Sequence, residues 1–253
     1  MKKKFQSPLM QGLLLLLIVL LSGFLRFRGL NWDDDYHLHP DERFLTLVES
    51  NLSPVDSLKA YFDTATSTLN PHNTGNTFYV YGTFPIFLVR YVAEWLDQSG
   101  YSQVYLVGRA FSAVFDLGII VLVYLIACRL FHKSEIGLLG ALLYGLATLP
   151  IQQSHFFTVD TFTNFFITAA IYVVICIFQA DSVFQERGKD MLRSKDFWNH
   201  VLFGVIVGLA AASKISAAVS AVLLSLAIVL RDYNDLKSSP ANRSQAFWKI
   251  MVA

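Results

Sequence analysis

Apolar residues occur in long runs along most of the chain, and short polar segments separate these runs. A helix needs about 20 mainly apolar residues to cross the hydrocarbon core of a bilayer, and several runs approach that length. The pattern therefore predicts an all-α integral membrane protein, a multi-span helical bundle. The predicted spans cover residues 9–25, 110–127, 136–157, 158–178, 200–212 and 215–230. We expect the long loop 26–105 between the first two spans to contain juxtamembrane helices.

Composition supports a membrane protein. Hydrophobic residues make up 54% of the chain and charged residues 15%, against roughly 25% charged in an average soluble domain. These values exclude a cytosolic enzyme, and a net charge of +1 gives no basic surface for nucleic acid. Cys128 and Cys176 both lie inside apolar runs, so no disulfide framework is indicated.

The two ends of the chain carry further membrane signals. Three lysines precede the leucine-rich run 9–25, as in signal peptides and in retained anchors. Since no small-residue cleavage site follows the run, we expect a retained anchor. Residues 246–253 resemble the beginning of a further span, so we expect the sequence to be the amino-terminal part of a longer protein.

Lysine and arginine are distributed unevenly between the polar segments. If the amino terminus is cytoplasmic, the inner segments hold most of these residues, whereas the short outer turns carry only Lys214. This asymmetry follows the positive-inside rule. It predicts that loop 26–105 and the turn at residues 151–157 are extracytoplasmic. We expect the membrane to be the plasma (inner) membrane of a prokaryote.

The densest cluster of reactive side chains lies just after the first span. Residues 31–44 (NWDDDYHLHPDERF) contain five carboxylates, two histidines and an arginine. Such groups beside lipid are costly unless they are solvated or functional, and a solvated loop is the simpler interpretation. Pro40 favours a helix that starts at Asp41, with Asp41 and Glu42 in its first turn. The pair would then lie at the mouth of a membrane cavity.

Two further segments add polar groups on the predicted outer side. Residues 78–96 are rich in aromatic side chains, including Tyr79 and Tyr81, and suggest a helix in the membrane interface. Asp160, Thr163, Asn164 and Thr168 share one helical face, which should face a watery cavity. Inside the second span, we expect Asp116 to be a buried acid paired with Arg109 or with a neighbouring hydroxyl.

In order and spacing, these features resemble those of a known family, the lipid-carrier-dependent glycosyltransferases of the GT-C fold. The resemblance is to the protein O-mannosyltransferase and aminoarabinose-transferase group. After the anchor span and Asp41-Glu42, the matching motifs are GRAFSAVFDLG from Gly108, RLF at residues 129–131, VDTF at residues 159–162 and GLAAASK ending at Lys214.

The resemblance implies a reaction and a set of residues. The donor would be a sugar on a polyprenyl phosphate, and the acceptor a hydroxyl on a protein, lipid or glycan. A single carboxylate acting as base supports displacement with inversion, and Asp41 matches the loop acid of the family, with Glu42 as its neighbouring support. Lys214 and Arg109 match positions that would bind the departing phosphate, Arg43 is proposed from proximity, and Asp160 would contact substrate.

Several alternatives stay open at this point. The reaction requires no cofactor, but Asp35, His37, His39 and Asp41 have side chains that suit a divalent metal such as Zn or Mn. A transporter with a polar outer vestibule is the second function class, although its charges would be expected near the bilayer midplane. Arg43, Arg109 and Lys214 could also be interfacial anchors.

Overall fold

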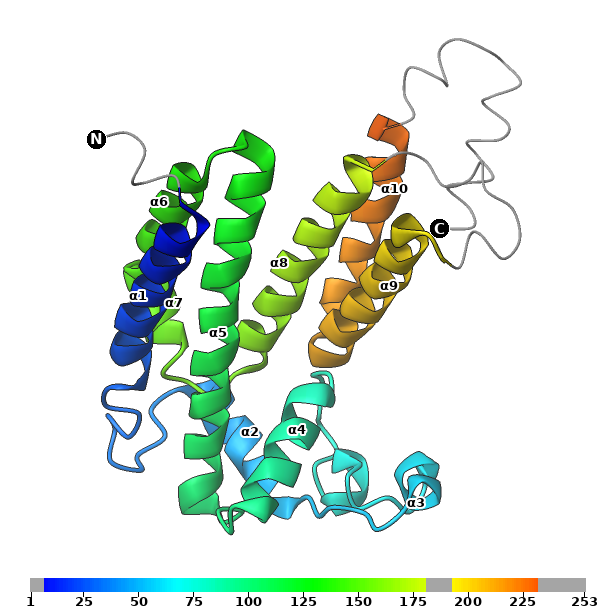
Figure 1. The fold of residues 1–253 in the computed structure, drawn as a ribbon. Helices are drawn as coiled ribbons and strands as arrows, with labels where there is room; N and C mark the ends of the chain where they lie inside the picture. The colour runs from blue at the N-terminus through cyan, green and yellow to red at the C-terminus, as the bar shows by residue number, and fades with distance from the viewer. Residues whose placement is uncertain (1–6, 181–192, 232–253) are drawn as a thin grey trace, which may run out of the picture.

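The computed structural model describes residues 7–180 and 193–231, and the regular elements in these ranges are helices (Figure 1). Two groups of elements can be distinguished. The long helices run side by side in a bundle, and the shorter helices that follow the first of them cover one end of it. The elements are α1 (Pro8–Phe27), α2 (Pro40–Asn51), α3 (Leu58–Phe62), η2 (Pro71–Thr74), α4 (Phe84–Trp95), α5 (Tyr101–Phe131), α6 (Ser134–Gly145), α7 (Thr148–Gln153), α8 (Val159–Phe178), α9 (Lys195–Ser213), η5 (Ile215–Ala221) and α10 (Val222–Arg231).

Four of the described helices, α1, α5, α8 and α9, are long and apolar enough to cross a membrane. Helix α6 and the stretch Ile215–Arg231 are shorter apolar segments. These helices agree with the predicted all-α membrane bundle. The last stretch, predicted as one helix over 215–230, is a 3-10 helix in η5 and an α-helix only in α10.

Helix α5 is longer than the predicted span 110–127. It has 31 residues, which at a rise of 1.5 Å per residue is about 46 Å and exceeds the roughly 30 Å hydrocarbon core. The loop between α1 and α5 therefore ends at Gly100 and not at residue 105. The added turns of α5 extend among the short helices (Figure 1) and carry Tyr105 and Arg109 to the candidate site.

The predicted span 136–157 is two helices, which corrects that prediction. Helix α6 ends at Gly145, and α7 begins at Thr148. Pro150 in α7 explains the break, because proline has no N–H and its ring clashes with the carbonyl four residues earlier. The free carbonyl of Gly145 accepts a hydrogen bond from Arg26 Nη1 at 2.9 Å, which stabilises the end of α6.

Arg26 also belongs to a buried ion pair between α1 and α5. Its Nε lies 2.5 Å from Asp116 Oδ2, and the two side chains are 0% and 4% exposed. Tyr144 of α6 donates its hydroxyl to Asp116 Oδ1 at 2.7 Å. The predicted pairing of Asp116 with a hydroxyl is confirmed, but its cationic partner is Arg26 and not Arg109.

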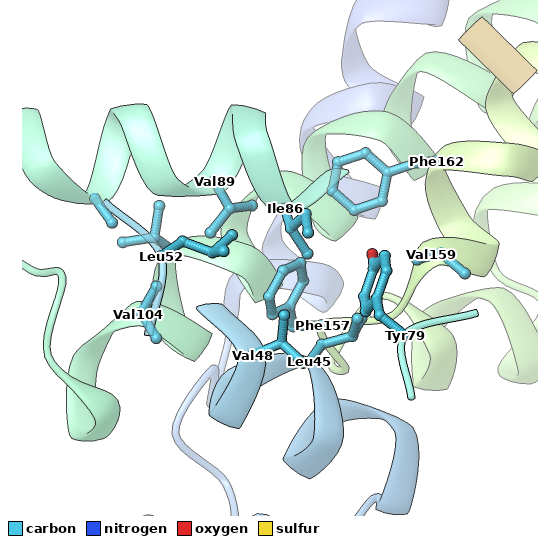
Figure 2. Packing of buried hydrophobic residues seen from close by; sticks show 12 residues of the cluster. Leu45, Val48, Leu52, Tyr79, Ile86, Val89, Val104, Phe157, Val159 and Phe162 are labelled. Atoms are coloured by element: carbon cyan, nitrogen blue, oxygen red, sulfur yellow. The ribbon is translucent and has the colours of Figure 1, made fainter. Parts of the chain in front are cut away.

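The short helices that cover one end of the bundle are held by an apolar core (Figure 2). Leu45 and Val48 of α2, Ile86 and Val89 of α4 and Phe162 of α8 are completely buried in one cluster. Burying an aliphatic side chain contributes roughly 1.5–3 kcal/mol, so α2 and α4 are fixed on the bundle. Tyr79 is buried in the same core, which corrects its predicted position among the lipid headgroups.

Candidate active site

Helix α2 begins where the sequence predicts. His39 is its N-cap and accepts the Glu42 N–H at Nδ1, 3.5 Å away, while Pro40 occupies the first turn. Asp41 and Glu42 follow in that turn, where a carboxylate is favoured by the positive end of the helix dipole. Although these residues are adjacent, the fold gives them different surroundings.

Glu42 is fully buried in contact with Arg109 of α5. Arg109 Nε donates to Oε1 of Glu42 at 2.7 Å, and Nη2 donates to Oε2 at 2.6 Å. The backbone N–H of Phe157 also donates to Oε1 at 2.7 Å. Glu42 therefore joins α2, α5 and the segment that leads into α8, which the sequence places far apart.

Two further donors of Arg109 bind the segment between α1 and α2. Nη2 lies 2.9 Å from Asp33 Oδ2, and Nη1 donates to the carbonyl of Leu30 at 2.5 Å. The guanidinium lies over the rings of Trp32 and Tyr105, at 5.7 and 4.7 Å from their centroids. Since the Arg109 side chain is 0% exposed, this cation holds the segment between α1 and α2 and does not lie at an open surface.

Asp33 is the second carboxylate of this buried group. Burial alone would raise its pKa, but the hydrogen bond from Arg109 and the Leu38 N–H lower it below the usual range. The ionised form is therefore the stable one around neutral pH. Through Arg109, Asp33 fixes the segment that follows α1, and Glu42 fixes the start of α2.

The partly exposed half of the site contains Asp41, Tyr81, Asp160 and Lys214. Lys214 Nζ lies 2.7 Å from Asp160 Oδ1, and the two side chains are 39% and 40% exposed. Burial raises the pKa of Tyr81, and Asp41 raises it further, while Lys214 acts in the opposite direction. The hydrogen bond that Lys214 donates to Asp160 raises the pKa of Lys214, although partial burial lowers it. Electrostatic interactions with Asp160, Tyr81 and Asp41 raise this pKa further. Three predicted residues and one tyrosine therefore interact in one cluster.

The backbone at Gly82 brings Tyr81 to this cluster. The N–H of Gly82 donates to the carbonyl of Ser213 at 3.1 Å, at the end of α9 and directly before Lys214. A methyl group at position 82 would overlap the carbonyl of Ala212 and lie 2.7 Å from the carbonyl carbon of Ser213. Glycine is therefore required for this close approach, in which Tyr79 also donates its hydroxyl to the Gly82 carbonyl at 2.7 Å.

The other predicted residues lie elsewhere in the segment between α1 and α5. Arg43 is exposed, and its Nε and Nη2 donate to the carbonyl of His37 at 3.1 and 3.0 Å. His37 packs between Tyr101 and Tyr105, His39 packs on Phe156, and Asp35 accepts the Tyr105 hydroxyl. Within residues 7–180 and 193–231, no group of three or more His, Cys, Asp or Glu side chains is arranged to hold a metal ion.

Two residues of the site were missed by the sequence analysis. The sequence gives Asp33 only as one of five carboxylates in residues 31–44, and it predicts that Tyr81 lies in the membrane interface. Nothing in the local pattern marks Asp33, because it is defined by Arg109, a partner distant in sequence. Tyr81 is likewise defined by a distant partner, Lys214. The adjacent Gly82 was the available signal, since glycine often marks a close backbone approach.

Comparison with known families supports the resemblance found in the sequence. The family model described as "Dolichyl-phosphate-mannose-protein mannosyltransferase" matches residues 80–253, which include Tyr81, Arg109, Asp160 and Lys214. Comparisons with curated proteins and with solved structures gave no match. The match covers well over half of the chain and agrees with the membrane bundle. The chain therefore belongs to the dolichyl-phosphate-mannose-protein mannosyltransferase family, whose members are membrane glycosyltransferases of the GT-C fold that depend on lipid-phosphate sugars.

Proposed function

We propose that this protein transfers a sugar from a polyprenyl phosphate to an acceptor hydroxyl on the extracytoplasmic side, with Asp41 as general base. One observation carries the assignment. Glu42 is fully buried in an ion pair with Arg109. The adjacent Asp41 is partly exposed and shares a cluster with Lys214 and Asp160. A base that removes a proton from a substrate must be accessible, and the Asp41 carboxylate meets this requirement.

In the proposed reaction Asp41 accepts the proton of the acceptor hydroxyl as its oxygen attacks the anomeric carbon. The bond between that carbon and the phosphate oxygen breaks, and the lipid phosphate departs with the electron pair. A single displacement inverts the anomeric configuration. Lys214 stabilises the negative charge that develops on the phosphate, and Asp160 orients the Lys214 ammonium.

Glu42 and Arg109 have a positioning role in this proposal. They fix the amino-terminal turn of α2 against α5 and the segment before α8, and thereby set the position of Asp41. Arg43 donates from one edge of its guanidinium to the His37 carbonyl and is a secondary candidate for contact with the lipid phosphate. No metal is required because Lys214 supplies the positive charge; transfer that stops when EDTA is added would overturn this part.

The family name suggests mannose as the first sugar to test and a protein hydroxyl as the first acceptor. Lipid and glycan acceptors belong in the same panel. The distribution of basic residues favours a cytoplasmic amino terminus and an outer active site in a prokaryotic plasma membrane. Cysteine labelling at Ser57 tests this topology, since a label introduced there should react from outside.

The decisive experiment measures sugar transfer in membranes that contain the wild-type protein or Asp41→Asn. Loss of a general base should lower the rate by roughly 10²–10⁴-fold. Asp56→Asn is the matched control, because Asp56 is an exposed carboxylate of the same loop. Equal turnover of Asp41→Asn and wild type at equal expression would overturn the role of Asp41. Solute uptake without breakdown of any donor would instead indicate a transporter.

A further inference from the structure

A cavity of about 290 Å³ lies beside the candidate active site, and the proposed reaction does not use it. It is lined by Trp32, Gln152, His155 and Phe156. These residues come from the loop after α1 and from the end of α7 with the turn that follows it. The cavity therefore opens on the outer end of the bundle, where Asp41 also lies.

The cavity adjoins the site through two direct contacts. Phe156 packs against His39, with ring centroids 4.4 Å apart, and His39 is the N-cap of the helix that carries Asp41. The next residue, Phe157, donates its N–H to Glu42. Phe156 and His39 thus connect the lining of the cavity to the first turn of α2.

The aromatic walls are fixed before any ligand arrives. The Trp32 indole packs edge-on against Phe156 at 5.8 Å, lies 5.7 Å from the Arg109 guanidinium and donates to the His155 carbonyl at 3.4 Å. His155 places Nδ1 2.7 Å from the carbonyl of Ile151 and Nε2 3.0 Å from that of Arg28. Both ring nitrogens therefore face backbone carbonyls, and in the neutral imidazole one of them donates.

The remaining polar group is the side-chain amide of Gln152, which is exposed at the rim. The lining therefore combines exposed aromatic surface with one neutral group that can donate and accept, and it contains no carboxylate, lysine or arginine. The face of an aromatic ring carries negative potential, which attracts C–H bonds polarised by neighbouring oxygens. A pyranose presents such C–H bonds on its faces and hydroxyls at its edge.

We propose that this cavity binds one pyranose ring, either the sugar of the lipid-linked donor or a sugar of the acceptor. The inference rests on the proposed transferase function. A peptide is the less suitable occupant, because an extended chain needs a groove or an unpaired strand edge, and the space is at the small end of the range for ligand pockets.

The test uses the whole chain in lipid nanodiscs and follows the binding of methyl α-mannopyranoside by saturation-transfer NMR. We expect saturable binding that Trp32→Ala weakens roughly 3- to 10-fold and that Gln152→Ala also weakens. Trp32→Phe, which keeps an aromatic ring on Arg109, should retain most of the affinity. Trp95→Ala is the matched control, since Trp95 is an exposed tryptophan on α4.

The two possible sources of the sugar are separated by adding polyprenyl-phosphate mannose. Competition with the glycoside would assign the cavity to the donor ring, and simultaneous binding would assign it to an acceptor ring. Affinity unchanged by both Trp32→Ala and Gln152→Ala would overturn the proposal, as would displacement of the glycoside by a serine- and threonine-rich peptide at lower concentration.

Failure of this inference can be distinguished from failure of the proposed function. Asp41→Asn should abolish transfer but leave glycoside affinity within about twofold, because Asp41 does not line the cavity. If Asp41→Asn remains active, the catalytic assignment fails while the binding result for Trp32 stands. If glycoside affinity is unchanged by both Trp32→Ala and Gln152→Ala, the cavity assignment fails while the Asp41 result stands.

Discussion

The carboxylate of Glu42 and the guanidinium of Arg109 form a two-point ion pair, with N–O distances of 2.7 and 2.6 Å and both side chains fully buried. The pair joins the helix that carries the proposed base to the span α5. A buried ion pair gains little net stability over apolar residues of the same shape, but breaking it leaves a charge buried without a partner. Its main effect here is to fix where α2 begins.

We expect Arg109→Met to destabilise the protein by about 3–5 kcal/mol. The substitution leaves the carboxylates of Glu42 and Asp33 buried without their cation. The shift of the thermal unfolding transition in nanodiscs measures the effect. Arg43→Met is the control and should shift the transition little, because Arg43 is exposed. If Glu42→Gln added to Arg109→Met restored no stability, the two side chains would not be coupled as described.

Lys214 should affect catalysis much more than stability. Its pair with Asp160 is partly exposed, and exposed ion pairs contribute about 0–1 kcal/mol. Lys214→Ala should therefore leave the unfolding transition almost unchanged but lower the transfer rate by on the order of 10²-fold, as for the loss of one group that stabilises developing charge. Lys214→Arg should retain more activity than Lys214→Ala. Equal activity of Lys214→Ala and wild type would remove this residue from the proposed reaction.

Glu49 should make the fold less stable at alkaline pH. Burial raises its pKa well above the usual range, although Arg90 partly lowers it, and the described residues give its carboxylate oxygens no hydrogen-bond partner. Below the ordinary glutamate pKa both folded and unfolded chains are protonated, and stability is complete. As the pH rises towards the folded pKa, the unfolded chain loses its proton first, so stability falls by about 1.36 kcal/mol per pH unit.

The measurement for Glu49 is the unfolding transition between about pH 5 and pH 9. Glu49→Gln should lose less stability than wild type across this range, because its amide does not ionise. Asp56→Asn, which changes an exposed carboxylate, should follow the wild-type profile. Parallel profiles for wild type and Glu49→Gln would show that the buried acid does not control this dependence.

Gly82→Ala should separate Tyr81 from Lys214. The added methyl group overlaps the backbone at Ala212 and Ser213, and overpacking of this kind costs about 1–3 kcal/mol. Displacement of the loop by about 1 Å would lower transfer by on the order of 10²-fold. Gly12→Ala is the control, because no described atom lies within 4 Å of the position of its added carbon. Full activity of Gly82→Ala would contradict the role given to this contact.

Several features of the fold could be predicted because their causes are local in sequence. Pro40 and the two acids after it define the start of α2, and long apolar runs define α1, α5, α8 and α9. Pro150 already carried the signal for the break between α6 and α7, which the apolar run concealed. The turns of α5 before residue 110 were not predicted, because tyrosine and arginine there interrupt the apolar pattern although the helix continues.

The amino-acid sequence by itself determined that this chain is a helical membrane protein with Asp41 and Glu42 at the start of a helix, since hydrophobicity, proline and helix-end charges act over a few residues. Only the tertiary structure decided the surroundings of each acid. Glu42 faces Arg109 and Phe157, which lie 67 and 115 positions away, and Asp41 shares a cluster with Lys214. Such partners are chosen by packing of the whole bundle, because burial and ion pairing depend on which distant segments meet.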